Sequence, residues 1–333
     1  MEYPLRQVRQ VKPDVHVWWL QLDLGPTTLG SLEGLLSPEE ISRAGRFAFD
    51  LHRRRYVAAH GLLRVVLADH LGTTPEKVAL ESESGGKPRL RGGGPCFNLS
   101  HAGPVGLVAV SADHEVGIDV EEIRDIAGLD ELAGTCFSPA ERAALAAVPA
   151  PDRLRAFFTG WTRKEAFLKA TGEGFSRPLS SFDVTLAPGE PARLLRVEGR
   201  AVFCALRALE PAPGYVGALA VLESQATVCY HTWDALSALL EDSDGTRGVG
   251  GHDPVRGRRQ PRGAVLDLAG RQGDSQRLAR GGQGRAEDGL PRLGEGQLDR
   301  HDAAQPASGR RAGGALRALK TAGKSRRPEA ARP

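Results

Sequence analysis

The stretch Val116–Gly117–Ile118–Asp119–Val120–Glu121 decides how the rest of the chain is interpreted. Its alternating apolar residues are typical of a short buried strand. On a strand, residues two apart point to the same face, so Asp119 and Glu121 lie side by side. Two carboxylates beside buried apolar neighbours repel each other unless a hard cation lies between them. The stretch therefore indicates a metal site, and the alternative is a polar strand end that faces water.

A second stretch, Trp161–Thr162–Arg163–Lys164–Glu165–Ala166–Phe167–Leu168–Lys169, has a helical pattern. Glu165 and Lys169 are four residues apart and share one helix face. Mg²⁺ prefers oxygen ligands and commonly joins protein carboxylates to substrate phosphates. The hypothesis is a Mg²⁺ site formed by Asp119, Glu121 and Glu165, with Lys169 beside a phosphorylated substrate.

The composition favours a folded protein without a membrane span. The chain has 333 residues, of which 41% are hydrophobic, and contains no apolar run of spanning length. The N-terminus lacks a signal-peptide pattern. The four cysteines are scattered without a Cys-x-x-Cys pair, so we expect neither a disulfide framework nor a zinc site. We expect a cytoplasmic location.

The net charge of +3 conceals two very different parts of the chain. Residues 245–333 carry a net charge of +10, whereas the first 244 residues carry −7, so we expect no nucleic-acid binding by the folded body. The segment 245–333 has no Ile, Met, Phe, Trp, Tyr or Cys, and 18 of its 89 residues are Gly. We expect it to be a disordered tail. It is either an Arg/Gly-rich arm for RNA or an acidic partner, or an appendage created by a shifted reading frame.

The order of elements predicts two similar halves. Ser37–Pro38–Glu39–Glu40 and Ser138–Pro139–Ala140–Glu141 both have the pattern of a capped helix start. A longer helix follows each, over about 52–71 and 152–170, and strands surround both. The fold class expected is α+β, with two α/β halves packed as an intramolecular pseudo-dimer. The expected boundaries are 1–115 for the first half, 116–224 for the second, 225–244 for a docked helix and 245–333 for the tail.

Several further residues suit the binding of a phosphorylated ligand. Arg43 and the arginines of Arg53–Arg55 can form bidentate hydrogen bonds with a phosphate. Alternatively, they form a solvated basic helix face. Lys87 belongs to a Gly-Gly-Lys-Pro loop whose backbone can lie along a flat ring. Ser100 and His101 follow a strand, in what is expected to be a turn, and both can donate to phosphate oxygens.

These motifs in this order resemble the 4′-phosphopantetheinyl transferase superfamily, and the two-half length resembles its pseudo-dimeric, Sfp-type branch. Each motif is unspecific alone, whereas the ordered set is highly specific, and the resemblance covers about residues 15–222. The stretches that carry it are Gly85–Gly86–Lys87–Pro88, Phe97–Asn98–Leu99–Ser100–His101, Val116–Glu121 and Trp161–Lys169.

The resemblance implies a role for each matching residue. The residues implied as Mg²⁺ ligands are Asp119, Glu121 and Glu165. The residues implied for coenzyme A are Arg43 and Arg55 at the 3′-phosphate, Gly86, Lys87 and Pro88 around the adenine, and Ser100, His101 and Lys169 at the phosphates. One position departs from the family pattern, because a basic residue expected just upstream of Arg43 falls on Glu40. The full set of 3′-phosphate ligands is therefore open.

The implied activity is Mg²⁺-dependent transfer of the 4′-phosphopantetheine moiety of coenzyme A to a serine of an apo acyl or peptidyl carrier protein. Adenosine 3′,5′-bisphosphate is the implied product, and the implied catalytic residues are Glu165, Glu121 and Lys169, with either glutamate as the general base. The alternative is a non-catalytic module that binds coenzyme A or a nucleotide. The chain is expected to act as a monomer, without a membrane, and the sequence does not specify which carrier it serves.

Overall fold

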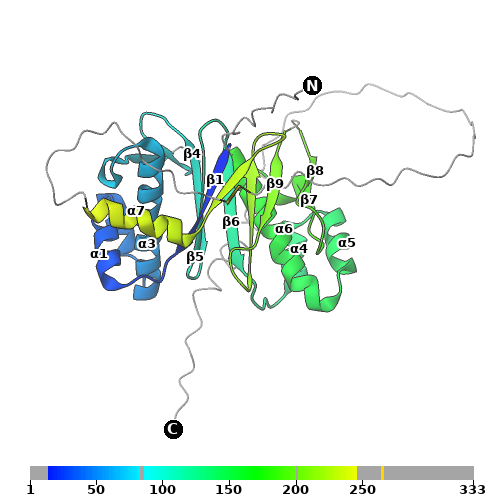
Figure 1. Cartoon of the computed structure of the whole chain (residues 1–333). Helices are drawn as coiled ribbons and strands as arrows, with labels where there is room; N and C mark the ends of the chain where they lie inside the picture. Colours follow the sequence, from blue (N-terminus) through cyan, green and yellow to red (C-terminus); the bar gives the residue numbers. More distant parts are fainter. Residues whose placement is uncertain (1–13, 83–85, 200–201, 246–263, 266–333) are drawn as a thin grey trace, which may run out of the picture.

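The computed structural model describes residues 14–82, 86–199, 202–245 and 264–265 (Figure 1). The expected disordered tail lies outside these residues, except for Gly245 and the two-residue strand β12 (Ala264–Val265). Gly85 of the Gly-Gly-Lys-Pro loop lies outside them too. None of the helices in the described ranges is both long and apolar enough to cross a membrane.

The fold is mixed, as expected, with helices on two outer sides and strands between them (Figure 1). Helices α1, α3 and α7 lie on one side, and helices α4, α5 and α6 lie on the other. The α-helices are α1 (Pro26–Glu33), α2 (Pro38–Ala44), α3 (Asp50–Leu71), α4 (Leu129–Cys136), α5 (Pro139–Ala147), α6 (Ala150–Thr171) and α7 (Trp233–Gly245). Short 3₁₀ helices are Pro75–Lys77, Gly174–Ser176 and Leu179–Ser181.

Two principal sheets fill the middle of the molecule. The larger has the strand order β12-β11-β1-β5-β4, and the smaller has the order β6-β10-β9. Their strands are β1 (Val15–Gln21), β4 (Cys96–Ala102), β5 (Val105–Ser111), β6 (Val116–Glu122), β9 (Ala205–Leu209), β10 (Tyr215–Val221) and β11 (Val228–His231). Two small hairpins pair β2 (Leu80–Ser82) with β3 (Pro88–Leu90), and β7 (Phe182–Val184) with β8 (Leu194–Val197).

Three clusters of buried apolar residues join these layers. One lies between the larger sheet and the helices around α3, and a second surrounds α6 and the smaller sheet. The third, which includes Val17, Ile118 and Leu219, lies between the two sheets. The two sheets therefore meet face to face along β6, where the amide of Ile118 donates to the side-chain oxygen of Asn98 at 2.8 Å.

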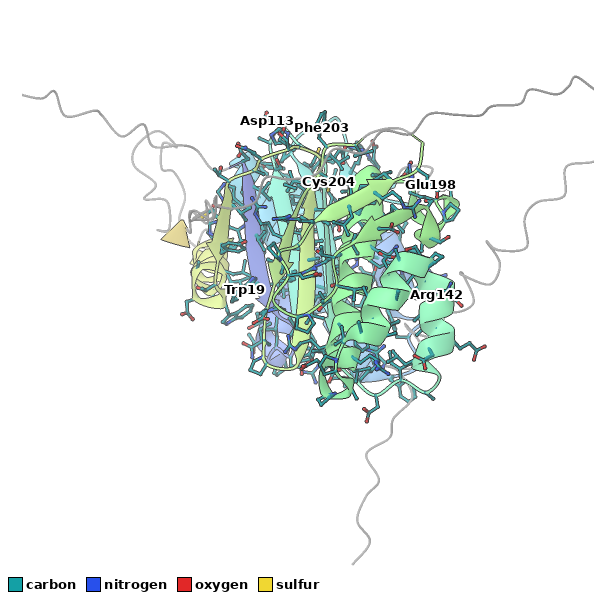
Figure 2. All side chains as sticks on the ribbon, turned by 90° about the vertical axis from the view of Figure 1, so that its right-hand side faces the viewer. Trp19, Asp113, Arg142, Glu198, Phe203 and Cys204 are labelled. Carbon is teal, nitrogen blue, oxygen red and sulfur yellow. The ribbon has the colours of Figure 1, made fainter. Side chains whose placement is uncertain are left out.

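Both predicted helix starts are confirmed. Ser37 and Glu40 form a capping box at α2, and Ser138 and Glu141 form one at α5. A 22-residue helix follows in each case, and the apolar residues of α3 from Val57 to Ala68 are buried. Figure 2 shows the second half facing the viewer, with Arg142 on α5 and the 76% exposed side chain of Phe203 at an edge of the molecule.

The turn expected at Ser100–Gly103 is wrong in its position. Strand β4 continues to Ala102, because Ser100 and His101 still pair with Leu107 and Gly106 of β5. The reversal falls at Gly103, whose φ of +53° suits glycine. Ser100 and His101 are thus held by a strand ladder.

The segment 225–244 contains more than the single docked helix that we expected. Strand β11 pairs in parallel with β1, and helix α7 packs on the first half, with Leu236 fully buried. Strand β1, the partner of β11, lies near the opposite end of the described chain, so local sequence patterns do not reveal this pairing. The larger sheet is therefore extended by a strand that follows the smaller sheet in the sequence.

Gly117 allows β6 and α6 to lie in direct backbone contact. A side-chain Cβ at this position would overlap the carbonyl oxygen of Ala166 and the amide nitrogen of Ala170. Gly117 shares its strand face with Asp119 and Glu121. The missing side chain therefore brings the face that carries the two carboxylates against the helix that carries Glu165.

Gly117→Ala tests this contact. We expect the free energy of unfolding, measured by urea denaturation, to fall by about 1–3 kcal/mol, because helix α6 and strand β6 must separate. The matched control is Gly134→Ala in α4, where a Cβ meets nothing within 4 Å. This control should be neutral or stabilising by up to about 1 kcal/mol. Equal stability of the Gly117→Ala variant and the wild type would contradict the close contact.

Candidate active site

One large cleft, of about 700 Å³, lies beside β6 and α6. Asp119 and Glu121 reach it from β6, and Glu165 and Lys169 reach it from α6. These four side chains come from two stretches that are distant in sequence. The close packing at Gly117 brings the two stretches together.

Asp119 is deeply enclosed, with 4% of its surface exposed, the same fraction as Glu165. Its Oδ1 accepts from the ammonium of Lys169 at 2.6 Å and from the hydroxyl of Ser100 at 2.9 Å. Its Oδ2 is buried and has no hydrogen-bond partner among the described residues. A buried anionic oxygen without a donor is costly, so this atom is suited to a cation.

Glu121 lies in a similar environment. One of its oxygens accepts from the indole N–H of Trp161 at 3.3 Å, and the other lies 3.5 Å from the guanidinium of Arg124. Burial and the nearby charge of Asp119 raise the pKa of Glu121 to about 7. Burial disfavours the charged form of Glu121, and a divalent cation beside it would offset this effect.

Every residue of the predicted site lines this single cleft, although the role of each remains a prediction. These residues are Arg43, Arg55, Gly86, Lys87, Pro88, Ser100, His101, Asp119, Glu121, Glu165 and Lys169. The cleft also has aromatic and basic neighbours that the motifs did not include, among them Phe47, Tyr56, His60 and Arg124.

Lys87 has a structural contact that its motif did not suggest. Its ammonium is buried and donates to Glu115 at 2.7 Å and to the carbonyl of Val116 at 3.0 Å. The charge of Lys87 is therefore used to fix its loop to the start of β6. The loop itself, with Gly86 at a φ of +80°, still offers backbone to the cleft.

Arg43 and Arg55, which also line the cleft, already contact other side chains of the protein. Arg55 forms a bidentate ion pair with Asp23 at 2.7 and 2.8 Å, and this pairing lowers the pKa of Asp23. Arg43 lies over the ring of Tyr56, at 5.6 Å from its centroid. Both guanidinium groups are thus held at the cleft wall.

Glu40 occupies the position where the family pattern would have a basic residue, and it has a clear local role. Its carboxylate accepts from the amide of Ser37, lies 2.9 Å from His60 and pairs with Arg64 at 2.9 Å. Burial alone would raise the pKa of Glu40, but these partners lower it to about 2. The carboxylate closes the capping box and holds Arg64, which is itself buried.

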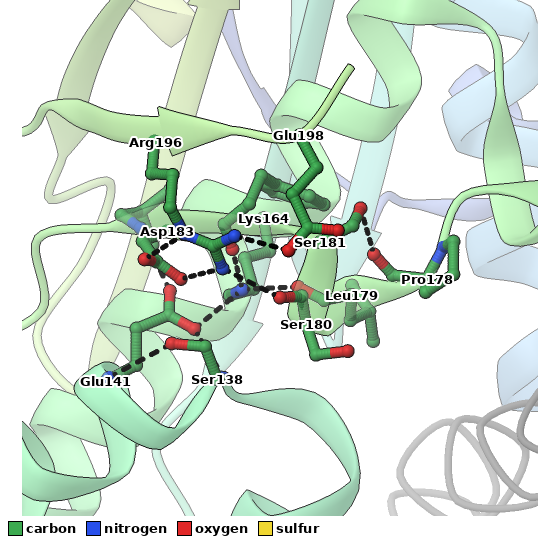
Figure 3. Close-up of polar contacts among 12 residues, drawn as sticks. Ser138, Glu141, Lys164, Pro178, Leu179, Ser180, Ser181, Asp183, Arg196 and Glu198 are labelled. Carbon is green, nitrogen blue, oxygen red and sulfur yellow. Dashed lines mark hydrogen bonds and ion pairs between the residues drawn. The ribbon is translucent and has the colours of Figure 1, made fainter. Parts of the chain in front are cut away.

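Lys164, next to Glu165 in sequence, is a residue whose role the sequence did not reveal. Its side chain is fully buried, and its ammonium contacts Glu141 at 2.7 Å and the carbonyls of Leu179 and Phe182 at 2.6 Å each (Figure 3). These partners tie α6 to α5 and to β7. Lys164 is a positioning residue for the helix turn that carries Glu165.

Comparisons with known proteins identify the family of this chain. The family described as the 4′-phosphopantetheinyl transferase superfamily matches residues 115–220. The 4′-phosphopantetheinyl transferase HetI of Nostoc sp. (strain PCC 7120) is 41% identical over 185 residues, which are 54% of this chain and 78% of HetI. The 4′-phosphopantetheinyl transferase psf-1 of Bacillus pumilus is 35% identical over 187 residues, which are 55% of this chain and 78% of psf-1.

This protein belongs to the 4′-phosphopantetheinyl transferase superfamily. The resemblance found in its motifs is thereby confirmed. The region matched by the family includes β6 and α6, which carry the acidic groups of the cleft.

Replacing Lys164 tests its positioning role. Lys164→Ala leaves Glu141 buried without its cationic partner, so we expect a loss of about 3–5 kcal/mol in the free energy of unfolding. Lys77→Ala, at an exposed position, is the control and should change stability by less than about 0.5 kcal/mol. Urea denaturation followed by circular dichroism measures both, and equal stabilities would show that the buried pair does not anchor α6.

Proposed function

We propose that this chain is a Mg²⁺-dependent transferase that moves the 4′-phosphopantetheine group of coenzyme A to a serine hydroxyl of an apo carrier protein. The observation that supports this most is the meeting of Asp119, Glu121, Glu165 and Lys169 in one cleft of a protein from this superfamily. The rest of the cleft is lined by cationic and hydroxyl groups of the kind that would bind a phosphorylated nucleotide.

Coenzyme A is proposed to bind along the cleft between the two halves. Arg43 and Arg55 would face its 3′-phosphate, and the backbone from Gly86 to Pro88 would lie along the adenine ring. Ser100, His101 and Lys169 would contact the pyrophosphate oxygens. The strand ladder that fixes Ser100, and the ion pair that fixes Arg55, would reduce the entropy lost on binding.

Asp119, Glu121 and Glu165 fit a Mg²⁺ ion, because Asp119 has a buried oxygen without a donor among the described residues and Glu121 has a raised pKa. When bound there, Mg²⁺ would neutralise negative charge on the pyrophosphate. The three residues present only carboxylate oxygens, which is the donor type that Mg²⁺ prefers.

The chain's own groups would handle the proton and the charges of the transfer. The carrier serine forms a new Oγ–P bond, and the bond from that phosphorus to adenosine 3′,5′-bisphosphate breaks. Glu165 or Glu121 would accept the serine proton. Lys169, which already lies 2.6 Å from Asp119, would place its ammonium beside the departing phosphate.

The two halves are proposed to be an intramolecular pseudo-dimer. In each half a capping box opens a short helix, a 22-residue helix follows, and a sheet covers the long helix. This arrangement would place the cleft between the halves, so a single chain would hold a complete site. A monomeric state, a cytoplasmic location and the absence of nucleic-acid or membrane partners for the folded body remain predictions.

Incubation with coenzyme A, Mg²⁺ and an apo carrier protein tests the proposed function. We expect mass spectrometry to show one added phosphopantetheine on the carrier serine. Asp119→Asn should lower the rate by about 10²-fold or more, because an anionic metal ligand is lost. The exposed Asp113→Asn variant is the control and should keep wild-type turnover.

Two results would contradict this proposal in different ways. Binding of coenzyme A without any mass gain on several apo carriers would favour a non-catalytic coenzyme A-binding module. Near-normal turnover by Asp119→Asn would leave the transferase activity in place and remove Asp119 from the metal site.

Removal of residues 246–333 tests whether the Arg/Gly-rich tail takes part. The cut must follow Gly245, because helix α7 packs against the first half. We expect the truncated chain to keep carrier modification within about twofold of the full chain, since no residue of the cleft is removed. Loss of activity with retained circular dichroism would show that the tail contributes to the reaction.

A further inference from the structure

A second group of chemically reactive side chains lies on the larger sheet, in a place that the transferase proposal does not use. His16 lies on β1, and Cys229 and His231 lie on β11. The parallel register sets His16 opposite Cys229 and Trp18 opposite His231. Residues two apart share a face, so these four side chains lie on one side of the sheet, with Trp18 in the core beneath α3.

The three metal-binding side chains are close together and largely enclosed. One ligand atom from each of His16, Cys229 and His231 lies within 4.8 Å of the others. Cys229 and His231 are only 5% and 6% exposed. Nδ1 of His16 lies 2.8 Å from Nε2 of His231, and Nδ1 of His231 is buried without a hydrogen-bond partner among the described residues.

Aromatic packing fixes the orientation of this cluster. The ring of Trp18 stacks on His231 with centroids 3.9 Å apart, and the indole N–H of Trp18 donates to His70 at 3.2 Å. The rings of His16 and His70 meet edge to face at 4.9 Å. Preorganised rings of this kind reduce the cost of forming a metal site.

The donor set points to a particular class of ion. Two imidazoles and one thiolate suit Zn²⁺ and neighbouring first-row transition ions, whereas Mg²⁺ and Ca²⁺ require oxygen. With Zn–N bonds of about 2.0–2.1 Å in a tetrahedral site, two ligand nitrogens lie about 3.3 Å apart. The nitrogens of His16 and His231 are 2.8 Å apart, so a shift of about half an ångström admits the ion.

We propose that His16, Cys229 and His231 form a binding site for a divalent transition-metal ion, with Zn²⁺ as the best-fitting ion and water as its fourth ligand. Binding converts the thiol of Cys229 to a thiolate and releases its proton to solvent. His16 is only partly buried, which leaves an entry path. The ion joins β11 to β1 and so fastens the returning segment of the chain to the first half.

This site is separate from the carboxylate cleft. The cleft residues lie on α2, α3, β3, β4, β6, α6 and neighbouring loops. His16, Cys229 and His231 do not line it. The inference therefore does not rest on the proposed function. The presence of a cysteine also gives it a spectroscopic signature that the carboxylates cannot produce.

Titration of the full chain with Co²⁺ in a large excess of Mg²⁺ tests the proposal. We expect one equivalent of Co²⁺ to give a thiolate-to-cobalt absorption band, which Zn²⁺ then removes by displacement. Zn²⁺ should also raise the midpoint of thermal unfolding, because it binds the folded chain. A wild-type chain that shows no thiolate band would overturn the proposal, whatever the variants do.

Matched variants assign the band to this cluster. Cys229→Ser and His16→Asn should each remove or weaken the band, lower Zn²⁺ affinity at least tenfold and abolish the thermal shift. Cys96→Ser and Cys204→Ser keep all three ligands and should behave as the wild type does. Circular dichroism checks that each variant folds. Wild-type Zn²⁺ affinity in a folded Cys229→Ser variant would overturn the assignment.

Discussion

The close approach of strand β6 to helix α6 is the constraint on which the rest of this structure depends. It exists because position 117 has no side chain, so the backbone of the strand meets the backbone around Ala166 and Ala170. The same strand face continues as Asp119 and Glu121, and the same helix turn continues as Glu165 and Lys169. The acidic groups thus converge because of a packing contact on their own two elements. The opposite face of β6 lies in the apolar layer between the sheets, so the strand cannot rotate away.

The electrostatics of the cleft follow from this convergence. Three carboxylates and one lysine share a partly enclosed space, and the lysine is already paired with Asp119. One ammonium cannot balance three carboxylates, and burial together with the charge of Asp119 raises the pKa of Glu121. Other charged residues near the cleft are neutralised within the fold, namely Lys87 by Glu115 and Glu40 by Arg64. The uncompensated charge is concentrated where a divalent cation and a phosphorylated substrate are proposed to bind.

Much of this arrangement could be predicted from local sequence. Strand alternation was enough to put Asp119 and Glu121 on one face, and helical spacing paired Glu165 with Lys169. The Ser-Pro-x-Glu motifs located two helix starts, since a capping box is formed within four residues. The ordered motifs then indicated the family, which the comparisons confirm.

The parts that could not be predicted depend on contacts between distant residues. Lys164 looked like an ordinary charged residue, and Lys87 was expected in a ligand-binding loop. Only the folded chain surrounds their ammonium groups with carbonyls and carboxylates. Strand β11 pairs with β1 across 213 residues from Val15 to Val228, which no periodicity encodes. The scattered cysteines gave no sign that Cys229 lies beside His16, because His16 is near the other end of the folded chain. Ser100 was assigned to a turn because its pairing with β5 was not visible in the sequence.

The central claim is that one cation is shared by carboxylates from β6 and α6. The most direct measurement is the anomalous diffraction of a crystal soaked with Mn²⁺, as a substitute for Mg²⁺, together with coenzyme A. The account predicts one strong anomalous peak in contact with Asp119, Glu121 and Glu165, next to the pyrophosphate. A structure with coenzyme A bound, no peak at these carboxylates and Glu165 turned away from Asp119 would contradict it.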